Sequence, residues 1–163
     1  MIYWGIDPGP SHCGVAYIRN GKPHGTIIPT SQLTDPYLPF PVNEINGEFY
    51  SPEKVRVGIE MPVGMGQVIG GEVLETAYVV GQISICLSQI ARVSRYGRKE
   101  IKRYFGVTGK GSDSQIRSAM INRWGEPGTK ANPGPTYGIT GDAWAALAVA
   151  TCVYDKEQHD KTL

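Results

Sequence analysis

Two short segments, far apart in the chain, share a pattern that restricts the fold more than any other feature. The pattern is IYWGID at residues 2–7 and VRVGIE at residues 55–60, in which large apolar residues alternate with other residues, as in strands. Asp7 and Glu60 end the two segments on the face opposite the large apolar side chains. If the strands are parallel neighbours in register, the two carboxylates lie side by side at the edge where open sheets bind ligands. Gly5 and Gly58 would then leave room beneath them.

The segments that follow the first strand indicate a meander. Residues 12–18 carry a second strand pattern, and a cluster of turn formers at residues 8–11 separates it from the first strand. A third short strand is expected at residues 25–28. Residues 29–53 then contain five prolines, which interrupt both helices and interior strands. We therefore expect a proline-rich surface excursion at about residues 29–53.

Helical patterns dominate the second half of the chain. Residues 71–94 are apolar on nearly all sides, which predicts a buried helix, and residues 92–105 mix strand and helix signals. A capping box at residues 112–115 opens a helix that ends near Trp124, and residues 142–154 form a final helix of small residues. Strands followed by helices predict an α/β fold, a mixed sheet flanked by helices. The length of 163 residues, 40% of them hydrophobic, fits a single domain spanning 1–163.

The composition argues against secretion and membrane insertion. No run of about 18 apolar residues is present, and the N-terminus enters a strand pattern without a basic and then apolar leader. Cys13, Cys86 and Cys152 are widely spaced and odd in number, which fits neither a disulfide framework nor paired zinc ligands. We therefore expect a cytoplasmic protein with reduced cysteines and no membrane partner.

The near-neutral net charge conceals two opposed regions. Residues 92–130 contain ten basic and three acidic residues, whereas the rest of the chain contains six basic and twelve acidic residues. Charges on exposed helix faces are often only solvated, and that interpretation stays open here. A basic segment of this kind is also typical of a nucleic-acid contact, so the formal charge of +1 does not exclude a nucleic-acid partner.

A third acid, Asp142, lies in the first turn of the expected final helix, where the helix dipole favours an ionised carboxylate. Each acid alone has a simpler explanation: Asp7 in an Asx turn, Glu60 as an exposed strand end, and Asp142 as a charge at a helix N-terminus. Together, three carboxylates that converge from distant segments repel one another unless cations neutralise them. Carboxylates and substrate phosphates hold Mg²⁺ or Mn²⁺. We therefore expect Asp7, Glu60 and Asp142 to form a metal site.

Several motifs carry a resemblance to a known family: GIDPG at residues 5–9, GVA at 14–16, Ile59-Glu60 after a strand, and DAWAALAVA at 142–150. In order and spacing over most of the chain, the sequence resembles the RuvC-like Holliday junction resolvases, including phage-type versions. These enzymes belong to the RNase H-like (retroviral integrase) superfamily. The resemblance implies an RNase H-like fold with a central mixed five-stranded β-sheet flanked by α-helices.

The resemblance also implies a homodimeric, metal-dependent endonuclease that binds branched DNA, especially four-way junctions. Asp7, Glu60 and Asp142 would be catalytic and would hold two Mg²⁺ or Mn²⁺ ions for phosphodiester hydrolysis, and Lys102 would act near the scissile phosphate. The expected phosphate contacts are Arg98, Lys99, Lys102, Arg103, Lys110 and Arg117. The apolar helix at 71–94 is the expected dimer interface. Such an enzyme would work in the cytoplasm of a bacterial or phage-infected cell.

Two departures from the family pattern leave the function open. The family has two aspartates three residues apart on the last helix, and the second falls on Ala145, so one metal ligand is missing. The proline-rich excursion at 29–53 replaces what is more often a short helix. One alternative is therefore a catalytically inactive junction-binding protein. Another is an RNase H-like nuclease that acts on a different nucleic acid.

Overall fold

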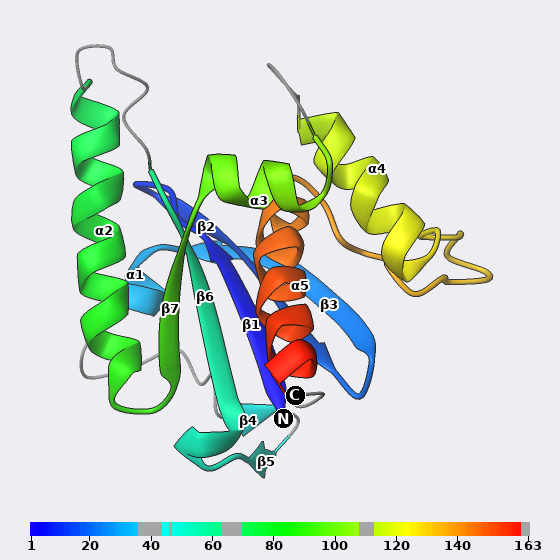
Figure 1. Ribbon diagram of the computed structural model, residues 1–163, viewed down its shortest axis with the longest axis horizontal. Helices are drawn as coiled ribbons and strands as arrows, with labels where there is room; N and C mark the ends of the chain where they lie inside the picture. Colours follow the sequence, from blue (N-terminus) through cyan, green and yellow to red (C-terminus); the bar gives the residue numbers. More distant parts are fainter. Residues whose placement is uncertain (36–43, 46, 63–69, 108–112, 161–163) are drawn as a thin grey trace.

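The computed structural model describes residues 1–35, 44–45, 47–62, 70–107 and 113–160. Its centre is a five-stranded sheet in the order β3-β2-β1-β6-β7 (Figure 1). The strands are β1 (Ile2–Asp7), β2 (His12–Arg19), β3 (Lys22–Pro29), β6 (Val55–Met61) and β7 (Arg92–Gly97). β2 pairs antiparallel with both β1 and β3, whereas β6 pairs parallel with both β1 and β7. The sheet is therefore mixed, which confirms the predicted fold class.

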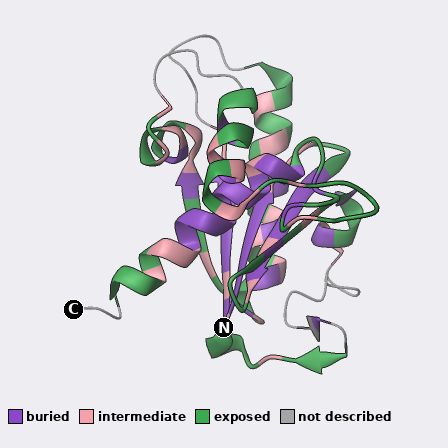
Figure 2. Cartoon of the chain, turned by 90° about the vertical axis from the view of Figure 1, so that its right-hand side faces the viewer, coloured by how far each residue is buried: buried purple, intermediate pink, exposed green. Residues whose placement is uncertain are grey.

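Helices cover both faces of the sheet (Figure 1). α1 (Ser31–Thr34) and α2 (Gly71–Ser88) pack on one face, and α3 (Arg98–Tyr104), α4 (Asp113–Trp124) and α5 (Ala143–Asp160) lie on the other. The alternation in β1 divides its side chains between two cores: Ile2, Trp4 and Ile6 pack under α2, and Tyr3 packs under α5. Figure 2 shows that the strands are largely buried, while exposed residues increase along α5 toward the C-terminus.

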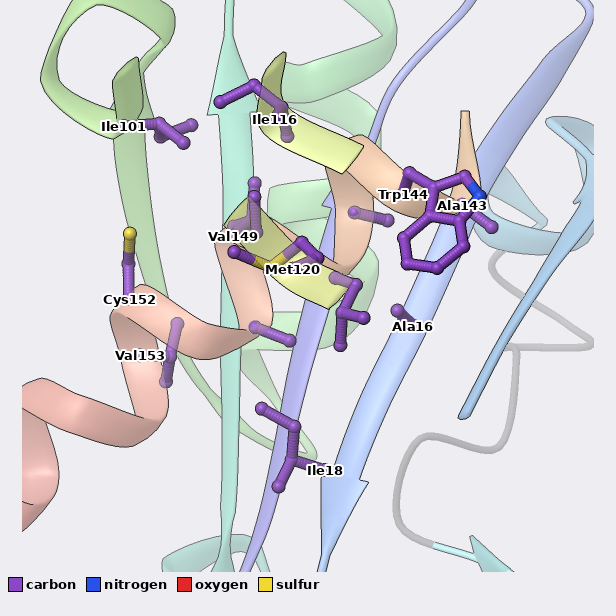
Figure 3. Close-up of a cluster of buried hydrophobic side chains, with 14 of the residues drawn as sticks. Ala16, Ile18, Ile101, Ile116, Met120, Ala143, Trp144, Val149, Cys152 and Val153 are labelled. Carbon is purple, nitrogen blue, oxygen red and sulfur yellow. The ribbon is translucent and has the colours of Figure 1, made fainter. Parts of the chain in front are cut away.

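The core under α5 joins segments that are distant in the sequence (Figure 3). Its buried side chains come from β1, β2, β7, α3, α4 and α5 and include Ala16, Ile18, Ile101, Ile116, Met120, Ala143, Trp144, Val149, Cys152 and Val153. Alanine favours helix formation and has a short side chain. α5 can therefore lie very close to the sheet.

Glycines in the strands set how close α5 comes. A Cβ atom on Gly5 would lie 2.0 Å from the carbonyl oxygen of Ala146, and one on Gly58 would lie 2.6 Å from the Val153 side chain. The expectation that Gly5 and Gly58 leave room beneath the carboxylates is therefore wrong, because α5 fills that space. The two glycines serve helix packing instead.

The expected helix at 71–94 is shorter and less buried than predicted. It ends at Ser88, and residues from Arg92 onward form β7 beside β6. Only one side of α2 joins the core, through Val79, Val80, Ile83 and Leu87. Three large apolar residues of the same helix are exposed instead, with 60%, 69% and 71% of the surface of Leu74, Tyr78 and Ile85 accessible.

Other boundaries also differ from the prediction. The third strand is longer than 25–28, and α5 continues to Asp160. Within the excursion at 29–53, residues 36–43 and 46 lie outside the described residues. The remainder includes α1, the strand pair β4 (Glu44–Ile45) and β5 (Glu48–Phe49), and a 3₁₀ helix at Pro52–Lys54.

The three cysteines form no disulfide in the structure. Cys13, Cys86 and Cys152 are all free thiols, and Cys13 and Cys152 are buried. None of the helices in the described part of the chain combines the length and apolarity that a membrane crossing requires.

Replacing Gly5 with Ala should destabilise the fold by about 3 kcal/mol or more, because the new methyl group overlaps the backbone of α5 and the helix must move away. Chemical denaturation measures this loss of unfolding free energy. Gly71→Ala is the matched control, since a Cβ there meets no atom within 4 Å, and it should leave stability equal or slightly higher. Equal effects of the two substitutions would contradict the packing described here.

Candidate active site

Asp7 and Glu60 lie at adjacent strand ends. β1 and β6 are parallel, and Gly5 pairs with Gly58 and Ile6 with Ile59, so the next residue on each strand carries a carboxylate. Both acids lie on the face that α5 covers, because the alternation places them with Gly5 and Gly58 rather than with Ile6 and Ile59. The structure therefore brings together the two acids that the sequence pattern paired.

Asp142 reaches the same place from the other end of the chain. It lies one residue before α5 rather than within its first turn, and its carbonyl oxygen accepts a hydrogen bond from the backbone N–H of Ala146 at 3.0 Å. Gly14, which pairs with Asp7 across β1 and β2, makes this approach possible. A Cβ atom on Gly14 would lie 2.3 Å from the carbonyl oxygen of Asp142.

The three acids line one pocket of about 520 Å³. Its lining comes from the ends of β1 and β6, from α3 and from the starts of α4 and α5, and Figure 1 shows how these elements are arranged. A fourth acid, Asp113, also lines it, together with Arg98, Lys102 and Arg117. Asp113 was not expected in the site, because its position at the start of a helix carries no signal beyond a capping role.

The surroundings of Asp7 favour its protonated form. Burial of the carboxyl group and then the negative charge of Glu60 raise the pKa of Asp7 to about 7. Arg98 acts in the opposite direction, and the charges of Asp142 and Asp113 raise the pKa further. The pocket therefore disfavours a full set of ionised carboxylates unless a cation enters.

Arg98 already provides one cation. Its Nη1 donates to Oε1 of Glu60 at 2.9 Å, and its Nη2 donates to Oδ1 of Asp113. The Glu60 side chain is almost buried, with 9% exposure. The sequence predicted Arg98 as a phosphate contact, whereas the structure shows its guanidinium bound to two carboxylates.

The chemistry of the donors fits a hard divalent cation, since three carboxylates line one pocket and repel one another there. Their spacing does not complete a coordination site. Within the described ranges, no group of three or more His, Cys, Asp or Glu side chains is placed to hold one ion. Glu60 is paired with Arg98 instead.

The other basic residues that were predicted to contact phosphates divide into two groups. Lys102 and Arg117 line the pocket, and the guanidinium carbon of Arg117 lies 5.4 Å from the centre of the Trp144 ring. Lys99 and Arg103 are exposed on α3 outside the pocket lining, and Lys110 lies outside the described residues. Ala145 also lines the pocket, so a methyl group occupies the wall where the resemblance calls for an aspartate.

No family model matches the sequence, and no curated protein matches it either. Among solved structures, the chain is similar to Thermus thermophilus RuvC, with a TM-score of 0.60 and 16% identity over 97% of each chain. The chain has the RuvC fold. It is also similar to T. thermophilus RuvC in complex with Holliday junction substrate, with a TM-score of 0.62 and 14% identity over 97% of this chain and 96% of that one.

The similarity to RuvC confirms the fold that the sequence motifs implied. It covers almost the whole chain, and the mixed five-stranded sheet with helices on both faces agrees with the expected RNase H-like architecture. At 14–16% identity the similarity describes the path of the backbone. The chemistry must be argued from the residues of the pocket.

Replacing Asp7 with Asn should stabilise the protein in the absence of divalent cations, and more at pH 8 than at pH 5. A carboxyl group with a raised folded-state pKa loses its contribution to stability as the pH rises toward that value, here about 7. The unfolding free energy of the wild type should therefore fall by about 2 kcal/mol, relative to the variant, between pH 5 and pH 8. Thermal denaturation in EDTA measures the difference.

Asp160→Asn is the matched control for this prediction, because Asp160 is exposed near the end of α5. It should show no comparable dependence on pH. Identical pH profiles for the wild type and Asp7→Asn would contradict the environment assigned to Asp7.

Proposed function

We propose that this protein is a metal-dependent, structure-selective DNA endonuclease that acts on four-way junctions or other branched DNA. The pocket carries the proposal: Asp7, Glu60 and Asp142 line it together with Lys102 and Arg117. Carboxylates beside basic residues suit the hydrolysis of a phosphodiester, whose negative charge must be bound and neutralised. The RuvC fold, seen elsewhere in complex with Holliday junction substrate, supports branched DNA as the substrate.

Asp7, Glu60 and Asp142 are the residues that would hold Mg²⁺ or Mn²⁺, with two ions as the full complement. Bound metal would supply activation of water and charge neutralisation at the phosphate. The protein itself contributes the position of the phosphate. Lys102 and Arg117 would bind its oxygens from within the pocket, and Lys99 and Arg103 would bind neighbouring phosphates along α3. Such contacts supply affinity and register but little sequence information.

A homodimer is part of the proposal. A four-way junction has local two-fold symmetry, and a two-fold dimer presents two equivalent sites to it. The exposed apolar residues of α2, namely Leu74, Tyr78 and Ile85, form one stripe, since they are spaced by four and seven residues. Contiguous exposed apolar residues of this kind mark protein contacts. The proposed dimer therefore forms through α2.

One alternative has an observation in its favour. Ala145 contributes a methyl group to the pocket wall, and Glu60 is bound to Arg98. A pocket that lacks one carboxylate and has another engaged suits a protein that binds junctions without cutting them. The same cleavage experiment distinguishes this alternative from the proposed nuclease.

Cleavage of a labelled four-way junction in Mg²⁺ tests the proposed function. Asp7→Asn should lower the rate tenfold or more, because it removes one of the carboxylates that would hold the metal, and Ala145→Asp should raise the rate by about tenfold through an added ligand. Linear duplex and an RNA–DNA hybrid serve as comparison substrates. Junction binding without cleavage by the wild type and Ala145→Asp would support the inactive alternative. Preferential cleavage of the hybrid would support a different nuclease.

The dimer should dissociate when the α2 stripe carries a charge. We expect Ile85→Glu to give a monomer in light scattering coupled to gel filtration, since burying an unpaired carboxylate in an interface is unfavourable. Phe49→Glu is the control: Phe49 is 75% exposed but lies on β5, away from α2. If Phe49→Glu dissociates the dimer and Ile85→Glu does not, the interface lies elsewhere.

A further inference from the structure

Arg98 binds two carboxylates of the pocket at once. The guanidinium reaches the nearly buried Glu60 through Nη1 at 2.9 Å and the exposed Asp113 through Nη2. The Arg98 side chain is itself 41% exposed. It therefore occupies the wall between the pocket and solvent, with an inner and an outer partner.

The backbone determines this position. In the parallel pairing of β6 and β7, Glu60 is opposite Tyr96 and Met61 is opposite Gly97. Arg98 follows directly as the first residue of α3. A long side chain at this point can reach back over the end of β6, so the contact with Glu60 follows from the strand register.

The contact changes what Glu60 can do. A guanidinium presents its N–H groups in a planar fork and is always charged, so it holds carboxylates in a defined geometry. While Glu60 binds Arg98, its charge is already neutralised and one of its oxygens is engaged. Asp7 and Asp142 have no such arginine partner among the ion pairs of the described residues.

We infer that Arg98 is a positioning residue that, in the protein without DNA, holds Glu60 away from the divalent cation. In the resting protein, Asp7 and Asp142 then offer their carboxylates to the ion while Arg98 serves as the cation on the Glu60 side. This inference rests on the proposed metal site. Mg²⁺ is commonly bound by one or two carboxylates together with substrate phosphates, so a site that lacks Glu60 is chemically reasonable.

The composition of the pocket agrees with Arg98 serving as the cation on the Glu60 side. Four acids and three bases line the pocket, so their charges nearly balance without metal. They are Asp7, Glu60, Asp113 and Asp142, and Arg98, Lys102 and Arg117. Ala145 adds no charge. A second divalent ion is therefore less necessary to neutralise the carboxylates than it would be in a pocket lined only by acids.

A double-mutant cycle on Mn²⁺ binding tests the inference. Isothermal titration of the DNA-free protein compares the wild type, Arg98→Gln, Glu60→Gln and the double variant, with Asp7→Asn as the test of the metal site itself. Arg98→Gln should bind Mn²⁺ about tenfold more tightly, because Glu60 is released to coordinate the ion. Glu60→Gln alone should change Kd by no more than about twofold, and the double variant should lose the gain.

Two arginine variants separate this effect from a general loss of positive charge. Arg117→Gln removes a cation that lines the same pocket. Arg95→Gln removes one from β7, at a position opposite Ile59 and hence on the other face of the sheet. Both should change Kd by less than about threefold, since neither side chain is paired with Glu60.

The possible failures are distinguishable. Equal Mn²⁺ affinity of the wild type and Arg98→Gln overturns the inference, while loss of binding in Asp7→Asn would leave the proposed metal site standing. A tenfold weaker affinity in Glu60→Gln also overturns it, because Glu60 would then already be a ligand. Absence of Mn²⁺ binding in every variant refutes both the inference and the metal site.

Circular dichroism shows whether Arg98→Gln folds. If it does not, Asp113→Asn replaces it in the titration, since that change removes only the outer, exposed partner of Arg98. Weaker anchoring of Arg98 should then tighten Mn²⁺ binding severalfold. Unchanged or weaker binding by Asp113→Asn overturns the inference.

Discussion

The close contact of α5 with glycines of the sheet is the constraint on which the site depends. Gly5 lets the backbone of α5 lie directly on β1, and Gly14 lets the residue before the helix, Asp142, lie against β2. Because Gly14 is the register partner of Asp7, the contact that packs the helix also sets Asp142 beside Asp7. Larger side chains in either strand would push the helix away and separate the acids. The packing of α5 on the sheet therefore also determines the geometry of the carboxylates.

The same contact creates an electrostatic problem. It gathers acids in a partly closed pocket, where burial and the charge of Glu60 raise the pKa of Asp7 to about 7. The basic residues on α3 and α4 offset this repulsion, and Arg98 does so most directly by binding Glu60 and Asp113. The oppositely charged parts of the sequence thus lie together in the structure. The basic segment supplies Arg98, Lys102 and Arg117 to the pocket that contains the acids. The formal charge of +1 for the whole chain reflects this compensation.

The strand segments and the shared face of Asp7 and Glu60 could be predicted from the sequence, because alternation depends only on which face of a strand is buried. The parallel pairing that makes the two acids neighbours was a condition of that prediction, and the structure supplies it. β7 was harder to recognise, since it is an edge strand whose residues are mostly exposed or half-buried and so lack a clear alternation. The site role of Asp113 could not be predicted, because it depends on a contact with a side chain fifteen residues away. The space assigned to Gly5 and Gly58 was wrong for the same reason: local pattern does not show which helix will cover a strand.

The two proposed interaction surfaces lie on opposite faces of the sheet. The pocket belongs to the face covered by α3, α4 and α5, whereas the apolar stripe belongs to α2 on the other face. Pairing two chains through α2 would therefore leave both pockets open to solvent and to DNA. It would also explain why α2 combines a narrow buried side with exposed Leu74, Tyr78 and Ile85, since a helix that only covered its own sheet would need one apolar side. The exposed side of α2 is thus the part of the apolar pattern that suits the expected dimer interface, and its buried side is the part that the sequence predicted as core.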